Sequence, residues 1–146
     1  MGGKGKTVVF GMLQRGGDIV VEVVPNRKSG TLLPIIRDNV KPHTEVHTDE
    51  HIAYGALSSM GLGYWHKTVC HNREEYVSPT GTTVNGIESF WRHLKCSIAG
   101  THISVSPKYL GTYAKEFEYR FNRRHNPASM LPELLSTFRP LPSKCD

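Results

Sequence analysis

The sequence has few cysteines and no long apolar run, and each shortage excludes a class of protein. Its 146 residues include three cysteines and no CxxC pair. An odd number of cysteines without such a pair argues against a disulfide scaffold and indicates a reducing compartment. No stretch of about 18 apolar residues occurs, so we predict no membrane span. The first six residues lack the apolar core of a signal peptide.

Motifs for nucleotide cofactors and for zinc are also absent from the sequence. Neither GxGxxG nor GxxxxGK followed by Ser or Thr occurs, so no nucleotide cofactor is predicted. His47 and His51 straddle an expected boundary between a strand and a helix, and no HExxH motif is present. Cys70 and His71 lack a second ligand pair, so we predict no zinc site there.

The residues that are present indicate a basic globular domain. Hydrophobic residues make up 38% of the chain and charged residues 21%, which is typical of a folded protein. The length suits one domain with a core of its own. The net charge is +5 and the pI is about 9.2. This balance suits a polyanionic partner such as nucleic acid, although many basic proteins bind none.

The local pattern predicts strands that alternate with helices. The segment Arg15-Gly16-Gly17-Asp18 separates two apolar, β-branched segments and predicts a hairpin turn. Ser29 is a candidate N-cap, and Pro34 is tolerable only near the first turn of the helix that follows. A hairpin followed by such units predicts an α/β sheet of mixed direction. The expected strands span 7–14, 19–24, 44–49 and 64–70, a polar loop spans 71–83, and the expected helices span 30–40, 51–60, 84–100, 106–124 and 132–138.

Two of these helices have informative faces. In the helix at 84–100, one polar side carries Asn85, Glu88, Arg92 and Lys95, and a solvated surface is the alternative interpretation of that pattern. In the helix at 106–124, which Pro107 is expected to begin, aromatic residues recur every four positions. That stripe predicts core packing rather than a binding platform. The apolar positions are Ile87, Phe90, Trp91, Leu94 and Ile98 in the first helix, and Tyr109, Tyr113, Phe117 and Phe121 in the second.

Two acids from separate elements are the candidate catalytic pair. Asp49 is expected at the C-terminal end of a strand, where active sites of α/β sheets gather. Glu88 lies on the helix at 84–100. Paired carboxylates suit a hard divalent cation such as Mg²⁺, which can promote phosphodiester chemistry, and Arg92 and Lys95 could then hold a phosphate. Alternatively, Asp49 caps the segment that follows it.

Four stretches of the chain resemble the catalytic domain of DDE-superfamily insertion-sequence transposases. The resemblance is to the branch that contains bacterial elements of the ISXO type and eukaryotic Merlin elements, and it runs in family order over residues 1–124. The most specific stretch is N-x-I-E-S-F-W-x-x-L-K, from Asn85 to Lys95. The other stretches are Gly2-Gly3-Lys4, His47-Thr48-Asp49 with Tyr54, and Tyr109-Leu110 onward through Glu116-Phe117 to Arg120-Phe121-Asn122-Arg123-Arg124.

The resemblance implies an RNase H-like domain over residues 1–126, followed by a Pro-rich tail over 127–146. It implies metal-dependent cleavage of transposon ends and strand transfer into target DNA, with two Mg²⁺ or Mn²⁺ ions. By position, Asp49 matches the second metal-binding acid, Glu88 the third, and Lys95 the cation that follows it. Some members are described with an asparagine in the third role, for which Asn85 is the candidate. A DNA partner, a homo-oligomer and a cytoplasmic, nucleoid-associated location are also implied.

One departure from the family pattern concerns its first acid. In the family that acid lies in a D-E-x-Y stretch just upstream of the Gly-Gly, on the central strand of the sheet. We therefore expect a domain that is truncated at its N-terminus and impaired in catalysis, with Asp18 a poor substitute. Without that strand, the hairpin and the strand before Asp49 would pair directly or leave exposed edges. The alternatives are a non-catalytic DNA-binding or assembly remnant and a different RNase H-like nuclease.

Overall fold

The N-terminal hairpin forms as the turn chemistry predicts. The computed structural model describes residues 7–69, 84–102 and 105–138. Strand β1 (Val8–Leu13) pairs antiparallel with β2 (Ile19–Val24), in a register that places Val8 opposite Val24 and Leu13 opposite Ile19. Gly16 in the turn has φ +71°, a left-handed conformation that favours glycine. The hairpin prediction is confirmed.

Helix α1 (Ser29–Asn39) starts one residue earlier than predicted. Ser29 is therefore the first helical residue and not the N-cap; the cap is Lys28, whose side chain makes no capping bond. Asn26 orders the entry instead, because its Oδ1 accepts from Lys28 N–H at 2.9 Å and from Thr31 Oγ1 at 2.9 Å. Pro34 lies past the first turn and has no N–H to donate to the carbonyl of Gly30, which is an exposed residue.

The second sheet is parallel and is connected by short turns. Strand β3 (Glu45–Thr48) pairs with β4 (Trp65–Thr68), with Glu45 opposite Trp65. The helix predicted over 51–60 is wrong. Two 3₁₀ turns, η1 (Ile52–Tyr54) and η2 (Leu57–Ser59), replace it on either side of Gly55, a poor helix former, and His51 Nδ1 accepts from Ala53 N–H to start the first turn.

Three helices make up the rest of the described chain. Helix α2 (Asn85–His102) and α3 (Pro107–Asn122) confirm the predicted pair, with Pro107 at the first helical position. After the short turn η4 (Pro127–Ser129), α4 (Met130–Thr137) begins two residues before the predicted start. The predicted loop at 71–83 lies outside the described residues. None of the described helices is long and apolar enough to cross a membrane.

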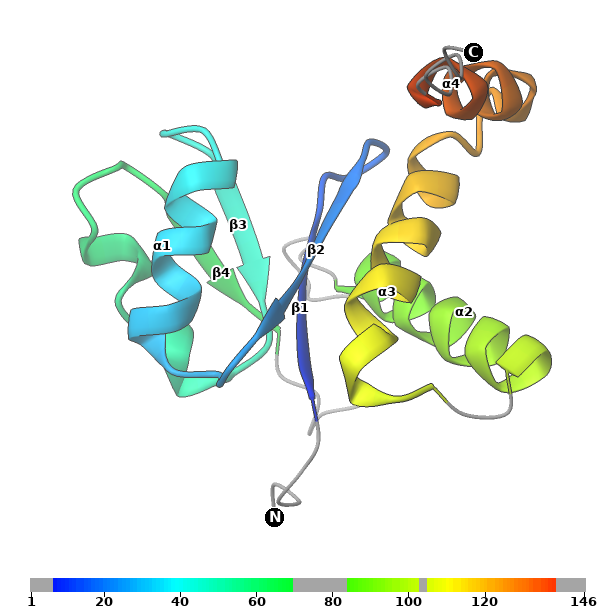
Figure 1. Ribbon diagram of the computed structural model, residues 1–146. Helices are drawn as coiled ribbons and strands as arrows, with labels where there is room; N and C mark the ends of the chain where they lie inside the picture. The colour runs from blue at the N-terminus through cyan, green and yellow to red at the C-terminus, as the bar shows by residue number, and fades with distance from the viewer. Residues whose placement is uncertain (1–6, 70–83, 103–104, 139–146) are drawn as a thin grey trace, which may run out of the picture.

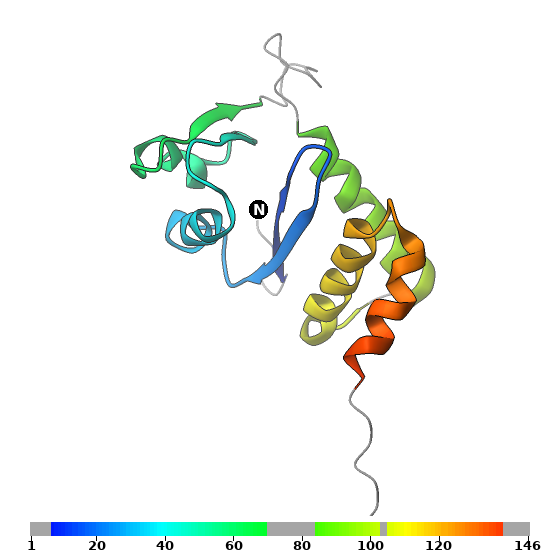
Figure 2. The same cartoon turned by 90° about the horizontal axis from the view of Figure 1, so that it is seen from above.

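The described strands form two separate two-stranded sheets rather than one mixed sheet. In Figure 1 the hairpin stands between a half built from α1, β3 and β4 and a half built from α2 and α3. Figure 2 shows the same order from above. Among the described strands, β1 and β3 do not pair with each other. The coarse α/β class is confirmed.

The hairpin is covered on both faces. Val8, Phe10 and Met12 pack toward α1 and the turns, whereas Val9 and Leu13 pack toward α2 and α3. This alternation follows from the two-residue period of a strand. Burial is uneven between the strands: β2 has buried residues, but every residue of β1 stays partly exposed.

Phe90 of α2 is at the centre of the larger core. It is 1% exposed and makes edge-on ring contacts with Trp91, Phe117 and Phe121 at centroid distances of 5.2 or 5.3 Å. The predicted aromatic stripe of α3 is confirmed at Phe117 and Phe121. It is wrong at Tyr109, which is 53% exposed.

Candidate active site

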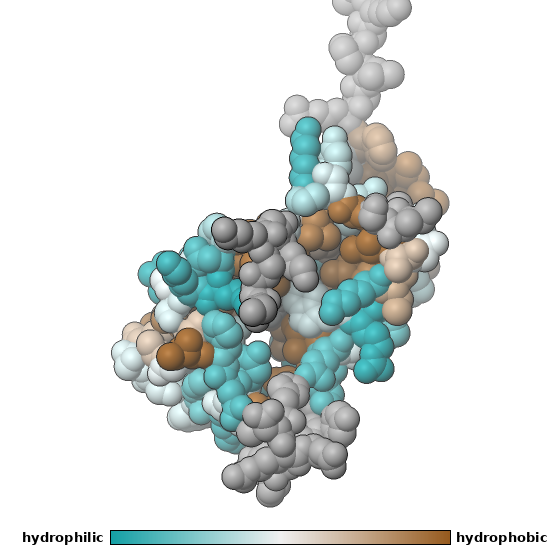
Figure 3. Space-filling view, turned by 90° about the horizontal axis from the view of Figure 1, so that it is seen from below, coloured by the Kyte–Doolittle hydropathy of each residue, from teal (hydrophilic) through white to brown (hydrophobic). Residues whose placement is uncertain are grey.

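A hollow of about 1050 Å³ lies between β1, β3, α1 and the first turn of α2. Every residue of β1 lines it on one side, and residues 44–48 line it on another. Asp49 and Glu88 both border this hollow, although they are separated by 39 positions in the sequence (88 − 49). Figure 3 views the molecule from below and shows apolar side chains gathered in the middle of that face, between polar surfaces.

Asp49 is positioned by the end of β3. Its side chain is exposed, and its Oδ1 accepts from His51 N–H at 3.2 Å. This bond turns the chain away from the strand, so the capping role is present in part. The carbonyl of Asp49 accepts from Thr48 Oγ1 at 2.8 Å, and that hydroxyl also lies 2.8 Å from His66 Nε2. Burial lowers the pKa of His66, which favours its neutral ring.

Tyr54 closes the side of the site next to Asp49. Burial raises the pKa of Tyr54, and the negative charge of Asp49 raises it further. The phenol therefore stays protonated and able to donate beside the carboxylate. Tyr54 also belongs to the hollow's lining and packs against the α1 side of the core.

Glu88 is positioned by a close approach of α2 to β1. It lies in the first turn of α2 and is exposed, and its N–H donates to Val84 O at 3.1 Å. A Cβ at Gly86 would lie 2.9 Å from Leu13 Cδ2, and a Cβ at Gly11 would lie 2.6 Å from Trp91 Cζ2. Glycine at these two positions thus lets the helix sit directly on the strand and brings Glu88 to the hollow.

The other predicted site residues are on α2 but away from the hollow. Asn85, Arg92 and Lys95 are exposed, and none of them lines the hollow. Asn85 is the first residue of α2, so it precedes the turn that faces β1. The structure therefore places Asp49 and Glu88 on the lining of one hollow and leaves the two cations outside that lining.

A polar chain crosses from the second sheet to the hairpin turn, and the sequence interpretation missed it. Lys67 Nζ lies 2.9 Å from Glu45 Oε2, Glu45 Oε1 lies 2.5 Å from His47 Nε2, and His47 Nδ1 lies 3.1 Å from Arg15 Nη2. The hydrogen bonds from Lys67 and then His47 lower the pKa of Glu45 to about 2. The signal available was the i, i+2 spacing of Glu45 and His47, which places both on one face of a strand.

The carboxylates that border the hollow suit a hard cation, but the described residues supply too few of them for a complete metal site. Carboxylate oxygens such as those of Asp49 and Glu88 are the ligands that Mg²⁺ and Mn²⁺ prefer. Residues 7–69, 84–102 and 105–138 contain no group of three or more His, Cys, Asp or Glu side chains placed to hold one ion. Two carboxylates on one hollow therefore fit part of a metal site.

Comparison with known proteins decides the family. The model of the ISXO2-like transposase domain matches residues 1–122. The chain belongs to the ISXO2-like transposase family. A relative from Haemophilus influenzae, described as an uncharacterized transposase-like protein, is 35% identical over 100 residues, which cover 68% of this chain and 77% of the relative. No solved structure matches the chain significantly. The resemblance inferred from the sequence is confirmed.

Membership in this transposase family gives the hollow its context. The family implies a role in transposition and DNA as the partner. The matched region ends at residue 122, so it includes β1 through α3 and stops before α4. Both acids of the hollow lie inside the matched region of this transposase domain.

Proposed function

We propose that this transposase domain cuts DNA at transposon ends and joins the ends to target DNA, with Asp49 and Glu88 as two of its metal-binding carboxylates. The observation that supports this proposal is that the two acids, from β3 and α2, border one hollow. Both side chains are exposed, so a DNA strand and an ion can reach them. Asn85 is the alternative third residue, but it lies outside the lining.

The cofactor of the proposed reaction is Mg²⁺ or Mn²⁺, as a pair of ions in a complete site. When bound, such ions activate an attacking oxygen and stabilise a leaving one. Asp49 and Glu88 would hold them. Arg92 and Lys95, on the next turns of α2, would contact DNA phosphates outside the hollow. Trp91 and Ile87 form an apolar wall beside Glu88 that restricts how a strand can enter.

The proposal includes an RNase H-like sheet whose central strand is not among the described residues. Among the described strands, β1 and β3 each pair on one side only, and the residues of both strands line the same hollow. The hollow has apolar walls on both faces, from Leu32 and Ile36 of α1 and from Ile87 and Trp91 of α2. A strand between β1 and β3 would be buried on both faces, and such strands are continuous apolar runs.

Metal titration by calorimetry tests the role of the two acids. We expect Mn²⁺ to bind the purified chain, and Asp49→Asn and Glu88→Gln each to weaken that binding by about tenfold or more. Glu116→Gln is the matched control, since Glu116 is an exposed helical carboxylate paired with Arg120. Equal Mn²⁺ affinity in the wild-type chain and both site variants would refute the assignment. In a DNA-cleavage assay with Mg²⁺ or Mn²⁺, the same two substitutions should abolish cleavage and preserve DNA binding.

A second candidate function is that of a non-catalytic DNA-binding or assembly module. It is favoured by the finding that the described residues gather no group of three metal ligands. The two functions differ in one measurement. If the protein binds transposon ends but leaves them uncut in Mg²⁺ and in Mn²⁺, the binding module is the correct function. The homo-oligomer remains a prediction under either function.

A further inference from the structure

Arg15 is an exposed arginine whose side chain is held by a histidine. It lies in the hairpin turn, borders the hollow with Asp49 and Glu88, and donates from Nη2 to His47 Nδ1 at 3.1 Å. An arginine nitrogen can only donate, so His47 Nδ1 accepts and its Nε2 carries the proton. That proton points to Glu45 Oε1 at 2.5 Å. Glu45 therefore stabilises the tautomer of His47 that carries its proton on Nε2, and Arg15 donates to Nδ1 of that same tautomer.

Among the described residues, no carboxylate pairs with Arg15 where His47 holds its guanidinium. Glu45 accepts from His47 and Lys67, not from Arg15. Within the described part of the chain, Arg15 forms no ion pair with a carboxylate, whereas three other arginines do: Arg37 with Asp38, Arg120 with Glu116, and Arg123 with Glu133. A fixed guanidinium whose partner is an imidazole and not a carboxylate keeps its remaining N–H groups and its charge for an anion.

From this geometry we propose that Arg15 binds a DNA phosphate at the mouth of the hollow, and that His47 is a positioning residue that holds the guanidinium there. The choice of phosphate as the anion rests on the proposed function, because DNA is the substrate that must pass the two acids. A guanidinium matches two phosphate oxygens at once, and an arginine already held by His47 loses less side-chain freedom on binding. The side chain of His47 is 12% exposed, so the ring is well held.

Salt-dependent DNA binding tests the role of Arg15. A fluorescently labelled duplex is titrated with the purified 146-residue chain at several KCl concentrations, without divalent ions. Arg15→Ala should weaken binding about tenfold and reduce the slope of log K against log salt by about 0.9, the value for one phosphate contact. Arg37→Ala is the matched control: it removes the same charge from an exposed arginine that is paired with Asp38, and it should leave the slope unchanged.

The role of His47 is tested by a pair of substitutions. His47→Leu removes the acceptor and should lower affinity in the same direction as Arg15→Ala. His47→Asn places an oxygen near the position of Nδ1 and should restore most of the binding. The double variant with Arg15→Ala and His47→Leu should bind no more weakly than Arg15→Ala alone, because both changes remove one contact.

The outcomes separate this inference from the proposed function. If the wild-type chain binds DNA but Arg15→Ala keeps the wild-type slope, the inference about Arg15 is overturned and the proposed function is not. If His47→Asn binds as weakly as His47→Leu, the positioning role of His47 is overturned. If the wild-type chain binds no duplex at any salt concentration, both the inference and the proposed function fail. Circular dichroism of each variant confirms that it is folded before binding is measured.

Discussion

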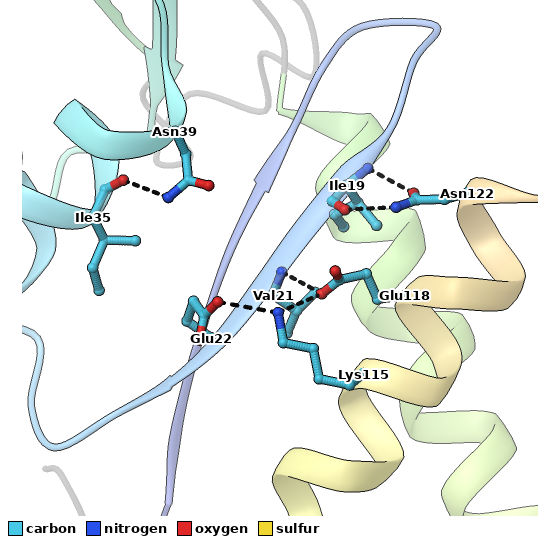
Figure 4. A network of polar contacts seen from close by, with 8 residues as sticks. All are labelled: Ile19, Val21, Glu22, Ile35, Asn39, Lys115, Glu118 and Asn122. Atoms are coloured by element: carbon cyan, nitrogen blue, oxygen red, sulfur yellow. Dashed lines mark hydrogen bonds and ion pairs between the residues drawn. The ribbon is translucent and has the colours of Figure 1, made fainter. Parts of the chain in front are cut away.

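The two outer edges of the hairpin differ in how their backbone groups are hydrogen-bonded. The outer edge of β2 is closed by side chains of α3: Asn122 Oδ1 accepts from Ile19 N–H at 2.8 Å, its Nδ2 donates to Ile19 O at 2.9 Å, and Glu118 Oε2 accepts from Val21 N–H at 2.8 Å (Figure 4). Lys115 Nζ then bonds both Glu118 and Glu22 at 3.1 Å. The helix thus satisfies backbone groups that a further strand would otherwise pair.

The outer edge of β1 has the same backbone groups but faces the hollow. The backbone N–H groups of Ile19 and Val21 point outward from β2, toward α3. In an antiparallel ladder, residues whose backbone groups point outward alternate along both strands, which places the N–H and C=O groups of Val9 and Gly11 outward from β1. Side chains at the turn reach across, but β3 forms no ladder with β1. The comparison teaches that the fold blocks extension of this sheet on one side and leaves it possible on the other.

The largest expected effect is on the closed side, at Phe90. Phe90→Ala should lower the free energy of unfolding by about 3–5 kcal/mol, because the ring is buried among three other aromatic rings. Trp91→Ala should cost less, about 1–3 kcal/mol, since Trp91 is half-buried and lines the hollow. Urea unfolding measures both. Equal losses of unfolding free energy would contradict the view that the core around Phe90 and the wall of the hollow at Trp91 are packed differently.

The next effect concerns the hydrogen bonds between Asn122 and the outer edge of β2. Asn122→Ala leaves the N–H and C=O of Ile19 without their partner, and we expect a loss of about 1–3 kcal/mol. Asn39→Ala is the control: its amide donates to Ile35 O at 2.9 Å on the exposed surface of α1, and its removal should cost less than about 0.5 kcal/mol. Urea unfolding of the two variants should show this difference, and a loss at Asn39 as large as that at Asn122 would contradict it.

Hydrogen exchange compares the edges directly. The amides of Ile19 and Val21 donate to α3 and should exchange slowly, close to the rate set by global unfolding. The amides of Val9 and Gly11 face the hollow and should exchange at least about tenfold faster. Amide-resolved NMR provides the measurement. Similar protection at all four positions would mean that the edge of β1 is already paired.

The smallest expected effect is acid-dependent and concerns the polar chain on the open side. The pKa of Glu45 in the folded protein is lowered from 4.5 to about 2 by Lys67 and His47. A depressed pKa stabilises the fold above the unfolded value of 4.5, and this contribution is lost as the pH falls toward 2. The stability difference between the wild type and Glu45→Gln should therefore shrink over that range. Urea unfolding at pH 6 and about 2.5 measures it, and a difference independent of pH would contradict the assignment.

Local chemistry explains which elements were predictable. The turn glycine at position 16 and Pro107 at the start of α3 act within a few residues, so their effects were visible in the sequence. The 51–60 segment has apolar residues at helical spacing, yet Gly55 and the His51 cap favour two 3₁₀ turns. Ser29 failed as an N-cap because Asn26 supplies the side-chain oxygen three residues earlier.

The sequence predicted which residues form the candidate site, but not where in the molecule that site lies. Asp49 and Glu88 were recognised from motif and spacing, and the structure puts both on one hollow. The roles of Glu118 and Asn122 were not visible, since their partners on β2 lie 97 and 103 positions away in the sequence. Arg15 was visible as a turn residue, and its contact with His47 spans 32 positions.

The sequence by itself determined the family and the alternation of strands and helices, and it offered the two acids as candidates, because these depend on residue types and short spacings. The tertiary structure alone decided that β1 and β3 stay apart, that α3 closes the edge of β2, and that both acids border the space between the two halves. The physical reason is that edge satisfaction depends on which distant side chains reach a given backbone group. That property belongs to the packed molecule and not to any short stretch of the chain.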